Sequence, residues 1–147
     1  MSEKEGSDKI VPPIKDVLQR MLDNSPFIAF LGLKVTEADP ANEQVTMTCA
    51  MRPEFERGKG TGQWHGGPLA AIIDTVGDYA LIMALRRGLP TINFRVDYLR
   101  PAVDTALVSV ARVRRAGKSV GVADVDVFDE RGALLAVGRG TYSTLET

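Results

Sequence analysis

The chain has 147 residues, of which 44% are hydrophobic and 25% are charged, and its formal net charge is −1 at pH 7. This length and composition are typical of one globular domain with a core of its own. The balanced charge lacks the basic excess that nucleic-acid-binding proteins carry. With a single cysteine, Cys49, an intrachain disulfide and a metal site built from cysteines are both excluded.

The first residues, MSEKEGSDK, are polar and lack the apolar core of a signal peptide. No run of the sequence is expected to approach the roughly 18 apolar residues of a membrane span. We therefore expect a cytoplasmic protein that binds neither a membrane nor nucleic acid. Residues 1–11 are predicted to be a flexible N-terminus, and residues 12–147 a single domain.

Two helical segments are predicted at the start of this domain. Pro12-Pro13 suit a first helical turn, and they precede apolar residues at helical spacing, namely Ile14, Val17, Leu18, Met21 and Leu22. The sequence Asn24-Ser25-Pro26 then breaks the pattern. A second apolar piece, residues 27–31, ends at Gly32.

The following residues predict two short strands and then a long helix. Residues 33–37 and 45–51 alternate between apolar and polar side chains, and a glycine-rich loop occupies residues 53–64. From Gly66 a broad apolar helical face continues for about 20 residues, or roughly 30 Å, and ends at Arg86-Arg87-Gly88. Because Asp74, Thr75 and Asp78 are almost its only polar residues, we expect other structure to wrap this helix.

Four further strands are predicted at residues 91–99, 107–115, 119–128 and 134–142. The turns around Gly117-Lys118 and at residues 129–132 are short, which favours antiparallel neighbours. The sequence therefore predicts an α+β domain in which one antiparallel sheet curls around one long helix.

This order of elements, together with a set of motifs, resembles the hotdog fold and, within it, the PaaI-like acyl-CoA thioesterases. The motifs are His65-Gly66-Gly67, Asp74 seven residues after Gly67, DYLRP at residues 97–101, the turn Gly117-Lys118, and AVGRGT at residues 136–141. The resemblance extends over residues 30–143. It implies a curved sheet of five to six strands around the central helix, with an N-terminal helical extension.

The same resemblance implies hydrolysis of an acyl or aryl-acyl coenzyme A thioester to the free acid and CoA. No cofactor is expected beyond coenzyme A as part of the substrate. In the family, the helix acid acts across a dimer interface and faces the partner's His-Gly-Gly, so we expect a homodimer, and by family habit a dimer of dimers, a homotetramer.

Thioester hydrolysis needs a polarised carbonyl and an attacking oxygen. The N-terminus of the long helix offers free N–H groups, and we expect the Gly66 N–H to be the oxyanion donor. Asp74 lies about 12 Å further along the helix, and the resemblance makes it the general base or the nucleophile. The sequence leaves these two roles open, and it also allows a helix-face carboxylate paired with an arginine.

Two further residues complete the predicted catalytic set. His65 is interpreted as a positioning residue near the carbonyl, although a lone histidine is also a candidate general base. Thr91 matches a family hydroxyl residue that helps hold the attacking water, yet threonine is ordinary at a strand start. Asp78 lies one turn beyond Asp74 on the same helix face and is left outside the catalytic set. It is interpreted as a second site residue, as a like-charge neighbour that disfavours the ionised form of Asp74, or as an acid that points to solvent or to an interface arginine.

The predicted substrate-binding residues are Gly67, Gln63, Lys59, Arg115 and Lys118. Lys59 occupies the position of a family asparagine six residues before the histidine, and Lys59 or Gln63 is expected to replace it. Arg115 and Lys118, near Arg114, are expected to hold the phosphates of coenzyme A or else to form a solvated turn. The aromatic residues Phe27, Phe30, Phe55, Trp64 and Tyr79 are interpreted either as an aryl-acyl pocket or as core.

Other functions stay open at this point. One alternative is a non-catalytic acyl-CoA-binding protein, which the missing asparagine keeps open. A hotdog hydratase or dehydratase is a further alternative, although the residues around His65 differ from those of that class. A zinc site is not expected, because the chain has one imidazole and one thiol.

Overall fold

The computed structural model describes residues 11–146, so the predicted flexible N-terminus lies outside the described residues except for Val11. Two helices, α1 (Ile14–Asp23) and α2 (Pro26–Leu31), come first, and the central helix is α3 (Gly66–Leu85). The strands are β1 (Lys34–Asp39), β2 (Gln44–Cys49), β3 (Thr91–Tyr98), β4 (Leu107–Ala116), β5 (Val120–Phe128) and β6 (Leu134–Ser143). The predicted α+β arrangement, with an N-terminal helical extension, is confirmed.

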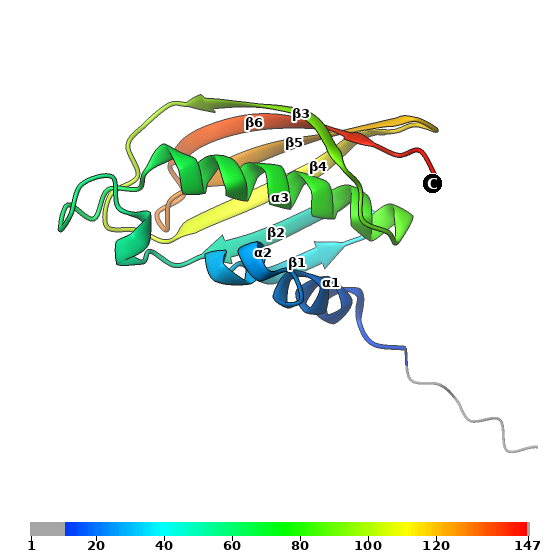
Figure 1. Ribbon diagram of the computed structural model, residues 1–147, viewed down its shortest axis with the longest axis horizontal. Helices are drawn as coiled ribbons and strands as arrows, with labels where there is room; N and C mark the ends of the chain where they lie inside the picture. The colour runs from blue at the N-terminus through cyan, green and yellow to red at the C-terminus, as the bar shows by residue number, and fades with distance from the viewer. Residues whose placement is uncertain (1–10, 147) are drawn as a thin grey trace, which may run out of the picture.

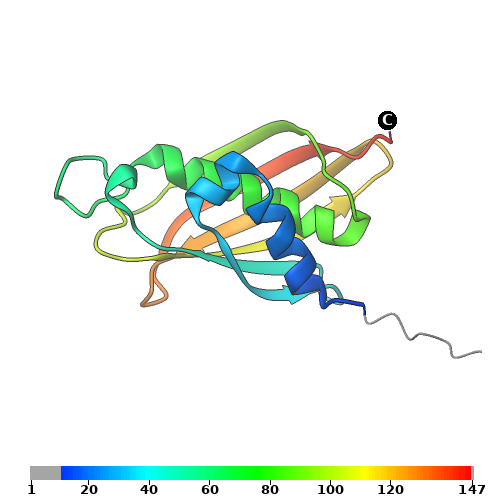
Figure 2. The same ribbon diagram turned by 60° about the horizontal axis from the view of Figure 1, so that its bottom comes forward.

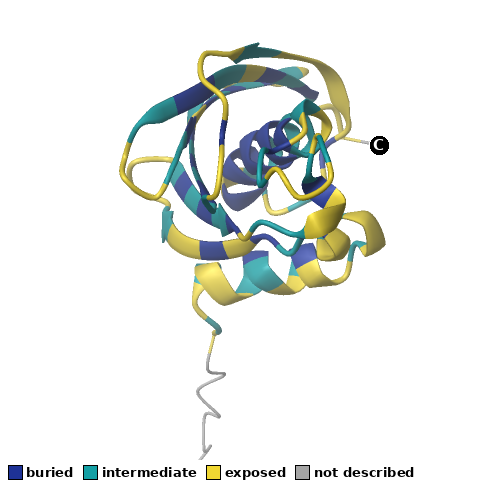
Figure 3. Cartoon of the chain, turned by 90° about the vertical axis from the view of Figure 1, so that its left-hand side faces the viewer, coloured by how far each residue is buried: buried dark blue, intermediate teal, exposed yellow. Residues whose placement is uncertain are grey.

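The strands form one six-stranded antiparallel sheet in the order β1-β2-β4-β5-β6-β3. Figure 1 shows α3 lying along one face of this sheet. In the view along α3, the sheet curls around the helix, and buried residues gather between the two (Figure 3). One layer of sheet and one helix therefore enclose the core, as an amphipathic sheet requires.

Helix α3 is apolar on nearly every side because it lies inside the curl of the sheet. Eleven of its residues are buried. By length and composition α3 could cross a membrane, so the expectation that no segment reaches this length and hydropathy is wrong. Its burial under the sheet marks it instead as the core helix of the domain.

The helix approaches strand β6 closely because small residues lie at the contact. A Cβ atom on Gly77 of α3 would lie 2.6 Å from the hydroxyl oxygen of Tyr142 on β6. The absent side chain lets the Tyr142 hydroxyl reach the helix backbone, where it donates a hydrogen bond to the carbonyl oxygen of Asp74 at 2.8 Å. Tyr142 thereby holds the middle of α3 in a fixed position against the sheet.

Helices cover one edge of the sheet, whereas the other edge is exposed. On the β1 edge, the Gln19 side chain of α1 accepts a hydrogen bond from Val35 N and donates one to Leu33 O, and Figure 2 shows α1 and α2 in front of this side. Strand β1 continues past its predicted end at residue 37 to Asp39. A bulge between Val35 and Glu37 shifts the alternation of side chains by one residue, so the pattern past this point no longer looks like the same strand. Strand β2 ends at Cys49, two residues before its predicted end.

Strand β3 is the other edge, and it pairs only with β6. Almost all of its residues are exposed. Its large apolar side chains Ile92, Phe94 and Tyr98 are 58%, 38% and 54% exposed. An uncovered edge strand with apolar side chains is a ready surface for pairing with another strand.

Candidate active site

The N-terminus of α3 offers the backbone N–H of Gly66 as a free donor among the described residues. His65 is the N-cap residue, and its Nδ1 accepts a hydrogen bond from Gly67 N at 2.9 Å. Pro68 has no N–H, and within residues 11–146 no acceptor lies at the Gly66 N–H. The positive end of the helix dipole and this N–H therefore point together at incoming negative charge. Because Nδ1 accepts, the His65 proton lies on Nε2, which is left as a donor.

Aromatic packing fixes the loop that leads into His65. The rings of Phe55 and Trp64 stack at 5.4 Å, and the Trp64 indole N–H donates to Thr105 O at 2.8 Å. The His65 N–H donates to Phe55 O at 2.7 Å. Phe55, Trp64 and Tyr79 are buried, which favours the core interpretation for these three aromatic residues, whereas Phe27 and Phe30 of α2 are exposed.

A cavity of about 430 Å³ lies in front of this helix N-terminus. The predicted residues Gln63, His65 and Gly66 line it, and Lys59 does not. Gln63 is therefore better placed than Lys59 to contact a substrate carbonyl. The whole lining is Arg57, Gln63, Trp64, His65, Gly66, Leu69, Tyr98, Leu99, Arg100, Pro101 and Ala102.

Several lining residues were not predicted as site residues, and the polar ones among them are Arg57, Tyr98 and Arg100. The Tyr98 hydroxyl donates a hydrogen bond to Gly66 O at 2.6 Å, and burial raises the pKa of this hydroxyl. Tyr98 and Arg100 belong to the DYLRP motif. The sequence indicates the family resemblance through this motif, but it does not assign these residues to the site. In a regular strand, Thr91 and Tyr98 would lie on opposite faces of the sheet, because they are an odd number of positions apart. A bulge between Thr91 and Asn93 shifts the alternation by one residue and places both side chains on the same face.

The Asp74 side chain lies near the middle of α3, where it is half-buried. Its Oδ1 accepts a hydrogen bond from the Thr91 hydroxyl at 2.8 Å, so the structure brings these two predicted residues together. Within residues 11–146 no arginine or lysine pairs with Asp74. Among the described residues of one chain, the alternative of a helix-face carboxylate held by an arginine is therefore not found.

The structure does not bring Asp74 and Gly66 together within one chain. Eight residues of helix separate them, which corresponds to an axial distance of about 12 Å. Each chain therefore presents two half-sites, Gly66 with Tyr98 at one end of β3 and Asp74 with Thr91 at the other. A single carbonyl cannot contact both half-sites of one chain.

Asp78 is more buried than its exclusion from the predicted set would suggest. Its Oδ1 is buried and has no hydrogen-bond partner in the part of the chain that the structure describes. Burial first, and the neighbouring charge of Asp74 second, raise the pKa of the Asp78 carboxyl to about 7. The interpretation of Asp78 as a solvated surface acid is wrong.

The basic residues predicted to hold phosphates lie apart from the His65 cavity. Arg115 and Lys118 belong to the hairpin between β4 and β5, near the C-terminal end of α3 in Figure 1. Arg114 instead pairs with Asp124 at 3.5 Å on the outer face of the sheet. Any role of Arg115 and Lys118 therefore requires a substrate that reaches the other half-site.

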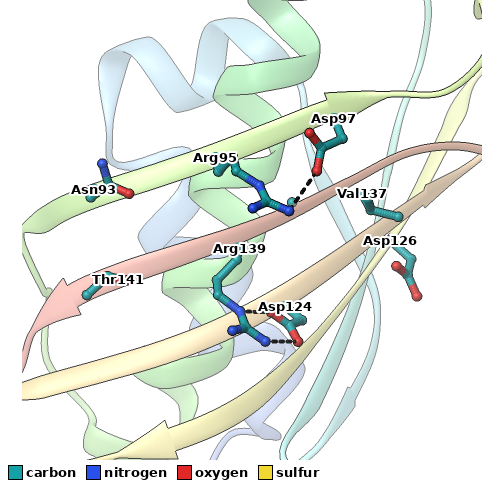
Figure 4. Close-up of a pocket in the computed structure, with 9 residues that line it drawn as sticks. Asn93, Arg95, Asp97, Asp124, Asp126, Val137, Arg139 and Thr141 are labelled. Atoms are coloured by element: carbon teal, nitrogen blue, oxygen red, sulfur yellow. Dashed lines mark hydrogen bonds and ion pairs between the residues drawn. The ribbon is translucent and has the colours of Figure 1, made fainter.

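The outer face of the sheet carries a larger hollow of about 500 Å³, which holds none of the predicted catalytic residues (Figure 4). Arg139 donates two hydrogen bonds to Asp124, at 2.6 and 3.0 Å, and Arg95 pairs with Asp97 at 2.9 Å. These bonds from Arg139 hold the pKa of Asp124 below its ordinary value. Since these opposite charges neutralise one another, this hollow is a poor place for an anionic substrate.

The single cysteine does not serve as a nucleophile. Cys49 is buried, its Sγ donates to Leu31 O at 3.1 Å, and burial raises the pKa of the thiol to about 11. It therefore stays a thiol at neutral pH. In the part of the chain that the structure describes, no group of three or more His, Cys, Asp or Glu side chains is placed to hold a metal ion.

Comparison with known proteins agrees with this geometry. A sequence model of the Thioesterase superfamily matches residues 61–136, which include both half-sites. The chain belongs to the thioesterase superfamily, and it is thus an enzyme of the thioester hydrolase class.

Relatives and solved structures extend the match over most of the chain. Acyl-coenzyme A thioesterase PaaI of Escherichia coli is 32% identical over 124 residues, which are 82% of this chain and 83% of PaaI. Acyl-coenzyme A thioesterase 13 of Mus musculus is 32% identical over 112 residues, 74% of this chain and 78% of that protein. The X-ray structure of a thioesterase superfamily protein superimposes with a TM-score of 0.83 at 32% identity and covers 88% of this chain and 97% of its own.

Proposed function

We propose that the protein is an acyl-CoA thioesterase that hydrolyses an acyl or aryl-acyl coenzyme A thioester to the free acid and CoA. The observation that carries the proposal is the Asp74 carboxylate, which Thr91 orients and which forms no ion pair with any residue from 11 to 146. The relatives named as acyl-coenzyme A thioesterases support this substrate class. In this assignment Asp74 acts as general base or nucleophile, and the Gly66 N–H is the oxyanion donor.

The β3 edge supports an active site shared between two copies of the chain. Thr91, which bonds Asp74, begins β3, and Tyr98, which bonds Gly66, ends it. Antiparallel pairing of β3 with its copy sets Thr91 opposite the partner's Tyr98. The Asp74 half-site of one subunit then faces the Gly66 half-site of the other, which one chain alone does not achieve.

The proposed reaction uses the groups of both half-sites. The Gly66 N–H and the helix dipole stabilise negative charge on the thioester oxygen, while the Nε2–H of His65 positions the carbonyl. As a base, Asp74 takes a proton from a water that Thr91 helps to hold, and the water oxygen bonds the acyl carbon. The carbon–sulfur bond then breaks, and the thiolate takes the proton, which gives free CoA and the acid. As a nucleophile, Asp74 itself bonds the acyl carbon while the carbon–sulfur bond breaks and CoA leaves as the thiolate. Water then hydrolyses the mixed anhydride, which releases the acid and restores the Asp74 carboxylate, and the proton set free goes to the CoA thiolate.

Binding of coenzyme A is assigned to residues at the edges of the shared cleft. Gln63 lines the cavity beside His65, and Gly67 holds the His65 side chain through its N–H, so both are assigned to the acyl end. Lys59 belongs to the loop that leads into His65. Val120 pairs with Ser143, and Tyr142 pairs with Thr91, so the hairpin of Arg115 and Lys118 lies at the Thr91 end of the sheet. From there these two cations are suited to the phosphates of CoA bound across the interface.

Thiol release from a panel of short, long and aromatic acyl-CoAs tests the proposed activity. The wild type should turn over at least one substrate, and Asp74→Asn should lose about a hundredfold or more in kcat. Asp126→Asn, an exposed acid on the outer face, is the matched control and should keep full activity. Tight acyl-CoA binding without turnover would instead indicate a binding protein, and turnover of an enoyl thioester would indicate a hydratase.

Mixed dimers test the shared site. Asp74→Asn and Gly66→Val should each be inactive alone, and co-expression should restore about a quarter of the wild-type sites, because one site of each mixed dimer is intact. Activity that stays absent in purified mixed dimers would contradict the shared site. Light scattering tests the predicted dimer and dimer of dimers, and a fully active monomer would overturn both.

A further inference from the structure

We propose that Asp78 is a positioning residue for Asp74, whose carboxyl group controls how strongly Asp74 attracts a proton during the reaction. The inference rests on the proposed role of Asp74 and extends it to a residue with no assigned role. Asp78 acts through Asp74 and is not assigned any contact with the substrate.

The two acids share one half-buried stripe of α3. Four residues separate them, an axial rise of about 6 Å, and positions four apart lie on the same helix face. Both are only half-buried, whereas the residues between them are buried. Their surroundings differ, because the Asp74 carboxylate has the Thr91 hydroxyl as its partner and the buried Oδ1 of Asp78 has none.

Within residues 11–146, no positively charged side chain pairs with Asp78 or offsets its charge. The neighbours that interact with its charge are Asp74 and Tyr79 on its own helix and Tyr142 on β6. Burial raises the pKa of both tyrosines, so they stay neutral, and the Tyr142 hydroxyl proton is committed to the backbone oxygen of Asp74. The charged residues of β3, β5 and β6 are Arg95, Asp97, Asp124, Asp126 and Arg139, and they line the outer face of the sheet (Figure 4). On β4, Arg112 and Arg114 lie on the same outer face, and Arg115 is exposed at the hairpin.

The charge state of Asp78 therefore changes the basicity of Asp74. With the pKa of Asp78 at about 7, Asp78 is largely neutral below this pH and Asp74 carries the only negative charge of the stripe. Above it both carboxylates are charged and repel each other at close range in a poorly solvated environment. Proton transfer to Asp74 relieves this repulsion, so the general base is stronger once Asp78 has ionised.

The pH dependence of kcat/KM tests this coupling with the full-length dimer and the best acyl-CoA of the panel. In the wild type we expect a rise of about three- to tenfold through pH 7. Asp78→Asn should keep its activity at pH 5.5 to 6 and should lose only the rise near pH 7. Asp126→Asn should reproduce the wild-type profile.

The outcomes separate this inference from the proposed function. A rise near pH 7 that persists in Asp78→Asn would overturn the inference, as would a folded Asp78→Asn protein that is inactive at every pH. Absence of turnover by the wild type on every substrate would overturn the thioesterase proposal instead. Carbon-13 NMR titration of the aspartate carboxyls is a second readout that needs no variant, and an Asp78 midpoint below pH 5 would also overturn the inference.

Discussion

The two faces of the sheet carry the same kinds of residue in opposite circumstances. On the outer face, Asp124 receives two hydrogen bonds from Arg139, and Asp97 pairs with Arg95. On the inner side, Asp74 and Asp78 lie in an apolar helix without a cationic partner among the described residues. On the outer face, these carboxylates have arginine partners and are also solvated. On the inner side, the carboxylates have no cationic partner among the described residues and are poorly solvated.

This difference explains why acids occur in a helix that is otherwise core. Exposed ion pairs contribute about 0–1 kcal/mol each, so the outer acids could be exchanged with little effect. An acid kept in a poorly solvated stripe destabilises the fold, and perturbed carboxyls of this kind concentrate at functional sites. We therefore assign the catalytic and positioning roles to the acids of α3, Asp74 and Asp78, rather than to the acids of the outer face.

The largest expected effect is on the stability of Asp78→Asn. The pKa of Asp78 is raised from 3.8 to about 7 in the folded state, so the folded protein binds the proton more tightly than the unfolded chain does. Wild-type stability should then fall as pH rises from about 4 to 7, by on the order of 4 kcal/mol. Asp78→Asn should lack this decline and should be the more stable protein at pH 8.

Urea unfolding at a series of pH values measures this effect at one fixed protein concentration, because dimer stability depends on concentration. The two proteins should have similar stability near pH 4 and should diverge toward pH 7. Asp126→Asn serves as the control for the loss of one negative charge. Parallel curves for wild type and Asp78→Asn would mean that Asp78 is solvated in the dimer, which would remove the contrast between the two faces.

A smaller effect is expected at Thr91, the partner of Asp74. Thr91→Val keeps the shape of the side chain but removes the hydroxyl that donates to Asp74 Oδ1. We expect a loss of about tenfold in kcat, the size of one hydrogen bond to a charged group, with little change in KM. Steady-state kinetics measure both constants, and Thr91→Ser should restore most of the rate, whereas a Ser variant as slow as Val would argue against the hydroxyl.

Sequence alone is enough to predict the order of the helices and strands, because periodicity changes clearly between 3.6 and 2 along the chain. It also predicts that Asp74 and Thr91 belong to one site, through the resemblance. It does not predict the bulge between Thr91 and Asn93, which brings Tyr98 to Gly66. The burial of Asp78 is equally hidden, since a helix pattern does not show which stripe the sheet leaves partly open.

The smallest effect is expected at Asp124, on the outer face. Asp124→Asn removes the carboxylate that Arg139 and Arg114 share, yet the side chains of Asp124 and Arg139 are 37% and 58% exposed, so water solvates the freed guanidinium groups. We expect a loss of less than about 1 kcal/mol, weaker still at high salt, and unchanged kcat and KM. The bonds from Arg139 hold the pKa of Asp124 low, so what stability they provide is present above about pH 4 and is lost as pH falls. Urea unfolding at low and high salt measures it, and a loss that exceeds the effect of Asp78→Asn would mean that a partner covers the outer face.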